Sequence, residues 1–304
     1  MVKTIDEIIR KVKDLPTKKI VIAGAESEEV LKSADEVLRE KIAEPILIGD
    51  REKIYEVAKK INIGLGAFSI VDTKDEVDAA KSAVELVSKG NAEVLVKGIA
   101  KTPVIMKAIL DKEYGLRTER LLTHVFLAQI KGFDRLLIMT DGGIIISPSL
   151  EEKIHIVQNA IDFAIAIGIE EPKVALLAAI ELVNPKMPES IEAAAISKMA
   201  ERGQIKGGIV DGPLALDNAI SEKSAKIKGI KSPIAGKADI LVVPDIRSGN
   251  IFGKSLMYFS NIKSAGLVVG ARAPVVLTSR SDSAENRLNS IAIGVLMAEN
   301  MKRT

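Results

Sequence analysis

One segment near the carboxyl end of the chain places hydroxyl and guanidinium groups where an anion could bind. The apolar run 275–277, typical of a buried strand, leads directly into Thr278, Ser279 and Arg280 at the start of a predicted helix. Free N–H groups at a helix N-terminus favour an anion, and an arginine can bind phosphate through two hydrogen bonds. The segment therefore predicts a phosphate site.

A structural interpretation of the same segment stays open. Asp282 and Glu285 have the spacing of a helix capping box, so these acids would also serve to start the helix. Capping accounts for the two acids but gives no reason for Ser279 and Arg280. We therefore favour phosphate binding by that pair.

A basic cluster lies at a second strand-to-helix turn, in the first half of the chain. Lys97 ends a predicted strand, Lys101 and Thr102 precede Pro103 at the start of a helix, and Lys107 lies within that helix. Cations beside a helix N-terminus form a plausible anion pocket. The alternative is a solvated lysine-rich face.

Two further turns put polar residues and glycine after apolar strands. In the first, Asp211 and Gly212 precede Pro213, which is expected to open a helix. In the second, Gly249 would allow close approach of a ligand to the backbone, and Asn250 would bind that ligand or cap the next helix. Ligands of open α/β sheets bind at the carboxyl ends of strands, where all these residues are expected.

The elements that must position these residues alternate between short apolar runs and longer amphipathic stretches. Such alternation predicts an α/β fold with mainly parallel sheets. The predicted strands are 20–23, 46–48, 68–71, 94–96, 135–139, 173–177, 208–210, 239–243, 267–269 and 275–277. The predicted helices are 27–41, 51–60, 74–88, 102–112, 150–167 and 283–297.

The length of 304 residues predicts two domains. We expect one α/β domain to comprise residues 1–139 and 266–304, with the C-terminal segment rejoining the first. The second α/β domain is expected to comprise residues 140–265.

The composition excludes several classes of protein. With 43 Lys and Arg against 41 Asp and Glu, the net charge of +2 argues against a general nucleic-acid binder. Without Cys, the chain has no thiolate metal site and no cysteine nucleophile, and it suits a reducing compartment. His124 and His155 alone leave little room for a histidine metal cluster. No secretory signal or membrane span is evident, so we expect a cytoplasmic protein.

The clusters together resemble the phosphate acetyltransferase/phosphate butyryltransferase family, and its butyryl branch most closely. Four ordered blocks in the second half carry the likeness: KVALLAAIELVNPKMPESIEAA, RGQIKGGIVDGPLALDNAIS, IAGKADILVVPDIRSGN and VVLTSRSDSAENRLNSIAIG. KGIAKTPVIMKAIL, YGLRTERLLTHVF and TDGGIIISPSLEEKIHIVQNAI resemble first-half blocks. The resemblance covers nearly the whole chain.

The resemblance implies reversible conversion of an acyl-CoA and phosphate into an acyl phosphate and CoA. It implies two α/β domains of the isocitrate/isopropylmalate dehydrogenase type with the active site in the cleft between them, and a homodimer or higher homo-oligomer. CoA is then a substrate, and no cofactor, metal, nucleic acid or membrane partner is expected. Ser279 and Arg280 match the family's active-site pair, and Thr102 and Lys107 match positions near the phosphate.

The sequence departs from the family pattern at two positions. Asn286 stands where the acetyl branch carries an acid proposed as the base for the CoA thiol, so either neighbouring Glu285 takes that role or the thiol loses its proton to water or phosphate. Asn286 itself is a candidate for binding CoA or phosphate. Arg247 replaces a glutamate, which adds an anion contact or reflects surface drift.

The absence of cysteine favours direct displacement in a ternary complex, because no enzyme thioester can form. Other functions stay open at this stage. They are a phosphate acetyltransferase, an NAD- and metal-dependent dehydrogenase of the same fold, and a non-catalytic CoA-binding relative. Transfer from an acyl carrier protein is a further alternative. The acyl-chain length does not follow from the residues.

Overall fold

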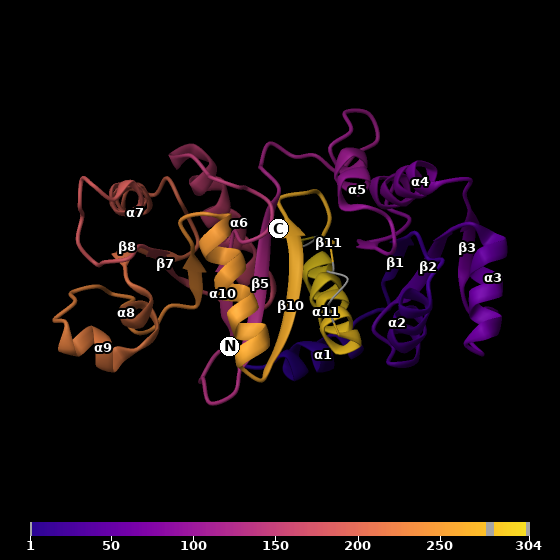
Figure 1. Ribbon diagram of the computed structural model, residues 1–304, viewed down its shortest axis with the longest axis horizontal. Helices are drawn as coiled ribbons and strands as arrows, with labels where there is room; N and C mark the ends of the chain where they lie inside the picture. The colour runs from indigo at the N-terminus through magenta and orange to yellow at the C-terminus, as the bar shows by residue number, and fades with distance from the viewer. Residues whose placement is uncertain (1, 278–282, 302–304) are drawn as a thin grey trace. The chain divides into compact units, whose positions relative to one another are not determined.

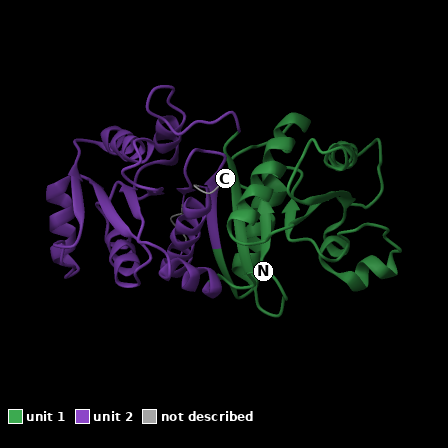
Figure 2. Ribbon diagram, turned by 180° about the vertical axis from the view of Figure 1, so that it is seen from behind, with its two compact units in different colours: residues 1–5, 121–264 green, residues 6–120, 265–304 purple. Residues whose placement is uncertain are grey.

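The computed structural model describes residues 2–277 and 283–301, and the chain divides into two compact units. Unit 1 comprises residues 1–5 and 121–264, and unit 2 comprises residues 6–120 and 265–304 (Figure 2). Both units are α/β, as the alternating pattern of the sequence predicted. No helix in the described part of the chain is both long and apolar enough to cross a membrane.

Unit 2 contains strands in the order β3-β2-β1-β4-β11-β10. Their bounds are β1 (Lys19–Ala23), β2 (Glu44–Gly49), β3 (Ser69–Asp72), β4 (Val94–Lys97), β10 (Ile262–Val269) and β11 (Val275–Val276). The first five strands of this order are parallel, and β10 runs antiparallel to β11. The first residues of β10 belong to unit 1 and the rest to unit 2.

The helices of unit 2 cover both faces of its sheet. They are α1 (Ile5–Lys13), α2 (Glu28–Arg39), α3 (Arg51–Lys60), α4 (Glu76–Ser88), α5 (Thr102–Ile109) and α11 (Ala284–Met301). In Figure 1, α2, α3 and α11 lie on one face and α4 and α5 on the other. Because both faces are covered, β1 and β4 read as continuous apolar runs rather than alternating ones.

The order of strands in unit 2 reverses beside β1. The chain passes from β1 outward to β2 and β3, and then returns to place β4 on the other side of β1. Such a reversal leaves a crevice outside the carboxyl ends of the two central strands, where ligands of open α/β sheets bind. Because β11 pairs in parallel with β4, the chain leaves β11 at the same edge of the sheet.

Unit 1 has the strand order β5-β6-β9-β7-β8. Its strands are β5 (Thr123–Ile130), β6 (Leu137–Thr140), β7 (Lys173–Leu177), β8 (Ile209–Leu214) and β9 (Ile240–Val242). Its helices are α6 (Leu150–Ala166), α7 (Pro188–Glu201), α8 (Leu216–Ile220), α9 (Glu222–Ile227) and α10 (Ile246–Phe259). Only β5 is antiparallel to its neighbour in this series.

The units begin and end at other residues than the predicted domains. The first predicted domain corresponds to unit 2. Residues 1–5 and 121–139 were expected in it, but they belong to unit 1. The reason is strand pairing: β5 forms an antiparallel ladder with β6, and β6 pairs with β9. The predicted boundary near residue 140 would have separated β6 from β9.

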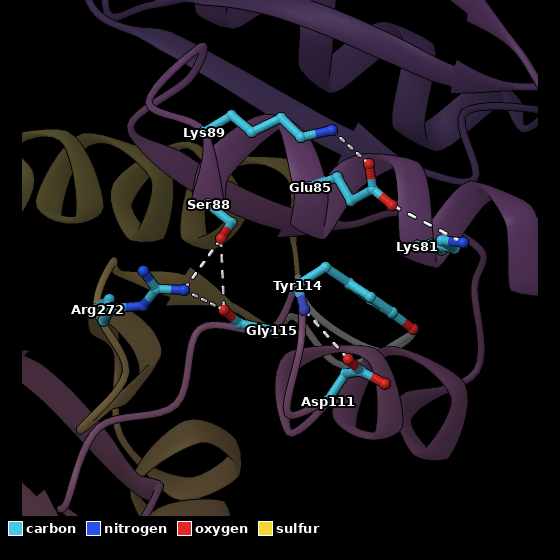
Figure 3. Close-up of polar contacts among 8 residues, drawn as sticks. All are labelled: Lys81, Glu85, Ser88, Lys89, Asp111, Tyr114, Gly115 and Arg272. Atoms are coloured by element: carbon cyan, nitrogen blue, oxygen red, sulfur yellow. Dashed lines mark hydrogen bonds and ion pairs between the residues drawn. The ribbon is translucent and has the colours of Figure 1, made fainter.

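Arg272 joins three separate segments of unit 2 (Figure 3). It lies in the turn between β10 and β11 and donates to the Gly115 carbonyl and, at 3.0 Å, to Ser88 Oγ. The backbone N–H of Arg272 donates to the Leu116 carbonyl at 2.9 Å, and Thr118 Oγ1 donates to the carbonyl of Gly270 at 2.6 Å. These bonds fix the end of α4 and the segment after α5 against the turn that begins β11.

We expect Arg272→Ala to lower the free energy of unfolding by about 1–3 kcal/mol, because the Gly115 carbonyl loses a charge-assisted donor. Urea unfolding followed by circular dichroism measures the loss. Lys89→Ala is the control, since Lys89 is exposed and its Nζ forms a surface ion pair of 2.6 Å with Glu85, four residues earlier. Equal losses in the two variants would contradict the role assigned to Arg272.

Candidate active site

The backbones that follow β1 and β4 approach each other closely at the carboxyl edge of unit 2. The Gly98 N–H donates to the Ala23 carbonyl and the Ile99 N–H to the Gly24 carbonyl, both at 2.9 Å. A Cβ added at Gly98 would lie 1.9 Å from the Gly24 oxygen. Glycine is therefore required at position 98, and the ladder between the two strands continues beyond their ends.

Three of the four predicted basic-cluster residues lie on this β4–α5 connection. Lys97 is half-buried at the end of β4, and its Nζ donates to the Gly98 carbonyl at 3.2 Å. Lys101 occupies the N-cap position of α5 and Thr102 begins the helix; both are exposed, and no side chain caps the helix. The positive end of the α5 dipole therefore lies beside two lysines at the switch point, an arrangement suited to an anion.

Two observations limit the size of this cluster. Lys107 is exposed in the last turn of α5, five residues after Thr102, so it starts about 7–8 Å further along the helix axis. In addition, the Glu76 carboxylate accepts a hydrogen bond from the backbone N–H of Lys101. One negative charge therefore lies beside the cations of the loop.

The second predicted phosphate segment connects β11 to α11. Val276, the last residue of β11, is paired with Val96 of β4, so this segment leaves the sheet beside the basic cluster. Thr278, Ser279 and Arg280 lie outside the described residues. The residues on either side of them place both ends of the segment in unit 2.

The start of α11 is capped by a residue other than the one considered from the sequence. Ser283 Oγ accepts a hydrogen bond from the Asn286 N–H at 3.1 Å, which is the spacing of an N-cap. Glu285 is exposed in the first turn. Asn286 is half-buried, and its carbonyl accepts from Ser290 Oγ at 2.8 Å. Glu285 and Asn286 therefore lie one turn or less from the segment that carries Ser279.

Arg287 was not singled out from the sequence, although it lies in the same first turn. Its Nη1 donates to the Glu29 carbonyl, at the start of α2, at 3.2 Å. Its Nε is buried and makes no hydrogen bond to any described residue. An arginine in the first turn of a helix opposes the helix dipole, and that unfavourable position is the signal that could have identified it.

Asp211 and Gly212 belong to unit 1 and make structural contacts. They lie inside β8 rather than at a strand-to-helix turn, and Pro213 continues that strand, so the prediction that Pro213 opens a helix was wrong. The Asp211 carboxylate accepts from Ser197 Oγ at 3.0 Å and from the Gly212 N–H at 2.8 Å. A Cβ at Gly212 would lie 2.7 Å from the Leu176 carbonyl, which explains the glycine.

Asn250 does not cap α10. The cap is Asp245, whose carboxylate accepts from the Ser248 N–H at 2.9 Å, and this bond holds the pKa of Asp245 below its ordinary value. The N-terminus of α10 is thus already occupied by a carboxylate. Asn250 is exposed further along the helix, and Arg247 forms an exposed ion pair of 3.8 Å with Asp245.

Among residues 2–277 and 283–301, no three His, Cys, Asp or Glu side chains lie close enough together to hold a metal ion. The groups at the edge of unit 2 include lysine, hydroxyl and side-chain amide groups. These groups bind and polarise anions and carbonyls.

Comparison with known proteins identifies the family. The family model described as phosphate acetyl/butaryl transferase matches residues 3–82 and 75–295. A phosphate butyryltransferase of Clostridium acetobutylicum is 47% identical over 300 residues, covering 99% of this chain and 100% of that protein. A phosphate acetyltransferase of Thermotoga maritima is 46% identical over 281 residues, covering 92% and 95%.

A crystal structure gives the same result in three dimensions. A branched-chain phosphotransacylase of Enterococcus faecalis superposes with a TM-score of 0.83 at 35% identity, covering 93% of this chain and 99% of that one. The expected resemblance is confirmed over essentially the full length. The chain belongs to the phosphate acetyl/butaryl transferase family.

Proposed function

We propose that the chain transfers a short-chain acyl group, with butyryl favoured, reversibly between CoA and inorganic phosphate. The observation that supports this proposal is the parallel pairing of β4 and β11, which end side by side at the edge of unit 2. Lys97 ends β4, Lys101 and the start of α5 follow it, and the paired strand β11, which precedes Ser279 and Arg280 in the sequence, ends at the same edge. Family membership supports the reaction class.

In the proposed mechanism a phosphate oxygen attacks the thioester carbonyl directly. The new C–O bond forms, the tetrahedral intermediate collapses with cleavage of the C–S bond, and CoA leaves as a thiolate. No enzyme thioester intervenes, because the chain has no cysteine. Arg280 and the lysines hold phosphate, and Ser279 donates a hydrogen bond to the oxyanion of the intermediate.

The reverse reaction requires removal of the CoA thiol proton, because a free thiol titrates at about 8.5. Asn286 cannot accept that proton, so we assign the task to Glu285 in the neighbouring position of α11. Thr102 and Thr278 supply hydroxyls to the phosphate. Lys107 is assigned to the inorganic phosphate or to the phosphates of CoA, which an exposed lysine can reach, and Asn286 is assigned to CoA.

The enzyme is proposed to act in the cytoplasm as a homodimer or larger homo-oligomer. The surface of α10 supports assembly, because Ile251, Tyr258 and Phe259 are 68%, 74% and 88% exposed on a helix whose only buried residues are two glycines. An apolar helix face of this kind is typical of an interface. The net charge and the lack of cysteine support the location.

Incubation of the protein with butyryl-CoA and phosphate tests the function. We expect CoA and butyryl phosphate to appear in equal amounts, and CoA release to depend on phosphate. A thiol reagent reports CoA alone, because the protein contributes no thiol. Absence of CoA release would overturn the proposal, and turnover of acetyl-CoA faster than butyryl-CoA would favour the acetyltransferase alternative.

A further inference from the structure

Ile99 lies at the centre of the candidate site with its backbone fixed. It follows Gly98 in the β4–α5 connection, two residues before Lys101, and its N–H donates to the Gly24 carbonyl at 2.9 Å. A Cβ built on Gly24 would lie 3.0 Å from Ile99 Cγ1, so the isoleucine side chain rests against the bare Cα of that glycine. Because Gly24 has φ +79°, the backbone there also favours glycine.

The side chain of Ile99 is nevertheless 49% exposed. The four loops at the carboxyl ends of β1, β2, β3 and β4 are otherwise polar or small: residues 24–27, 49–50, 73–75 and 98–101. Ile99 is the only large apolar side chain among them. An isolated exposed isoleucine elsewhere on a surface needs no explanation. At this position it lies within a loop whose other groups suit an anion.

The proposed reaction brings an alkyl chain to the same place. Phosphate held by Lys97 and Lys101 at the start of α5 must contact the thioester carbonyl carbon, and the alkyl chain is bonded to that carbon. The chain therefore extends from a point beside the phosphate, and an apolar surface there removes its methylenes from water.

We propose that Ile99 contacts the alkyl part of the acyl group and favours butyryl over acetyl. This inference rests on the proposed function and deepens it. Acetyl-CoA has no methylene beyond the carbonyl-bound methyl, so the contact stabilises the longer substrate selectively. We expect this contact to favour butyryl-CoA over acetyl-CoA about tenfold. This is the low end of the range for one methylene group in an apolar pocket, because one side of Ile99 faces solvent.

The test compares kcat/KM for acetyl-, propionyl- and butyryl-CoA at saturating phosphate. In Ile99→Ala we expect the butyryl-to-acetyl ratio to fall about tenfold, with propionyl intermediate. Ile99→Val, which removes one carbon, is expected to lower the ratio about threefold and retains the β-branched shape if the alanine variant fails to fold. Ile227→Ala is the matched control, because Ile227 is 77% exposed at the end of α9 in unit 1.

The outcomes separate this inference from the proposed function. A purely structural role for Ile99 would lower kcat/KM for all three substrates together and leave their ratio unchanged, which would overturn the inference. The same holds if Ile227→Ala changes the ratio as much as Ile99→Ala. Absence of phosphate-dependent CoA release in the unaltered protein would instead overturn the proposed function.

Discussion

Gly98→Ala is expected to lower kcat about a hundredfold and to lower the free energy of unfolding by about 1–3 kcal/mol. The new Cβ would lie 1.9 Å from the Gly24 oxygen and 2.9 Å from the Ala23 oxygen, and both of these are backbone atoms. They cannot rotate away as a side chain would, so the β4–α5 connection must shift. A shift of about 1 Å is enough to misplace groups that orient substrates.

Gly64→Ala is the control variant for Gly98→Ala. Nothing lies within 4 Å of a Cβ at Gly64, and its φ is not in the left-handed region. That variant is expected to keep its activity and stability. Both variants are assayed for CoA release and unfolded in urea. Full activity and unchanged stability in Gly98→Ala would show that the site does not depend on this close approach.

The second large effect is expected at Ser279. Ser279→Ala should lower kcat by about 10²–10³ with little change in KM, because the lost hydrogen bond is made only to the oxyanion of the intermediate. Steady-state rates with butyryl-CoA and phosphate measure both constants. The neighbouring Ser281→Ala removes the same atom from the same segment and serves as the control.

Two results would contradict the assignment to Ser279. One is a rise in KM for phosphate at unchanged kcat, which would make Ser279 a binding residue for the ground state. The other is an equal loss of kcat in Ser281→Ala, which would indicate a general disturbance of the segment. Rescue by Ser279→Thr would support a hydroxyl donor.

The parallel core could be predicted because its strands are continuous apolar runs. β1, β4 and β7 were placed to within one residue, and the helices α2 and α3 begin within one residue of the predicted starts, where the side chains of Ser27 and Asp50 cap them. β5 was not recognised as a strand. Its apolar run contains His124 and Gln129, and its antiparallel pairing with β6 depends on residues that follow the intervening turn.

Pro213 was assigned to a helix start and α7 was not predicted, because the sequence around each of them is ambiguous. Proline at a strand end usually opens a helix, but β8 is the last strand of its series, and an edge strand tolerates proline. The sequence of α7 is rich in alanine and carries charges on several sides, so its periodicity is weak. The local sequence is ambiguous at both places, and the packing of α7 against β8 helps to fix both elements.

In the candidate site, too, residues that lie close together in the sequence were predicted, and contacts between distant parts of the sequence were not. Lys97, Lys101 and Thr102 were found together because one strand-to-helix turn contains them all. Arg287 was missed because its partner carbonyl, on Glu29, is 258 residues away in the sequence. Asn250 was misassigned as a possible cap because Asp245, five residues earlier, competes for the same helix end more strongly.

The division of the chain between the units constrains the order of events during synthesis. Residues 121–264 are complete before residues 265–304 leave the ribosome, so unit 1 can fold while unit 2 still lacks β11 and α11. Until then β4 has no partner strand on its outer side. The unpaired backbone N–H and C=O groups of this apolar strand are then open to pairing with another chain. Truncated or stalled chains that end before Val275 are therefore expected to be the aggregation-prone species of this protein.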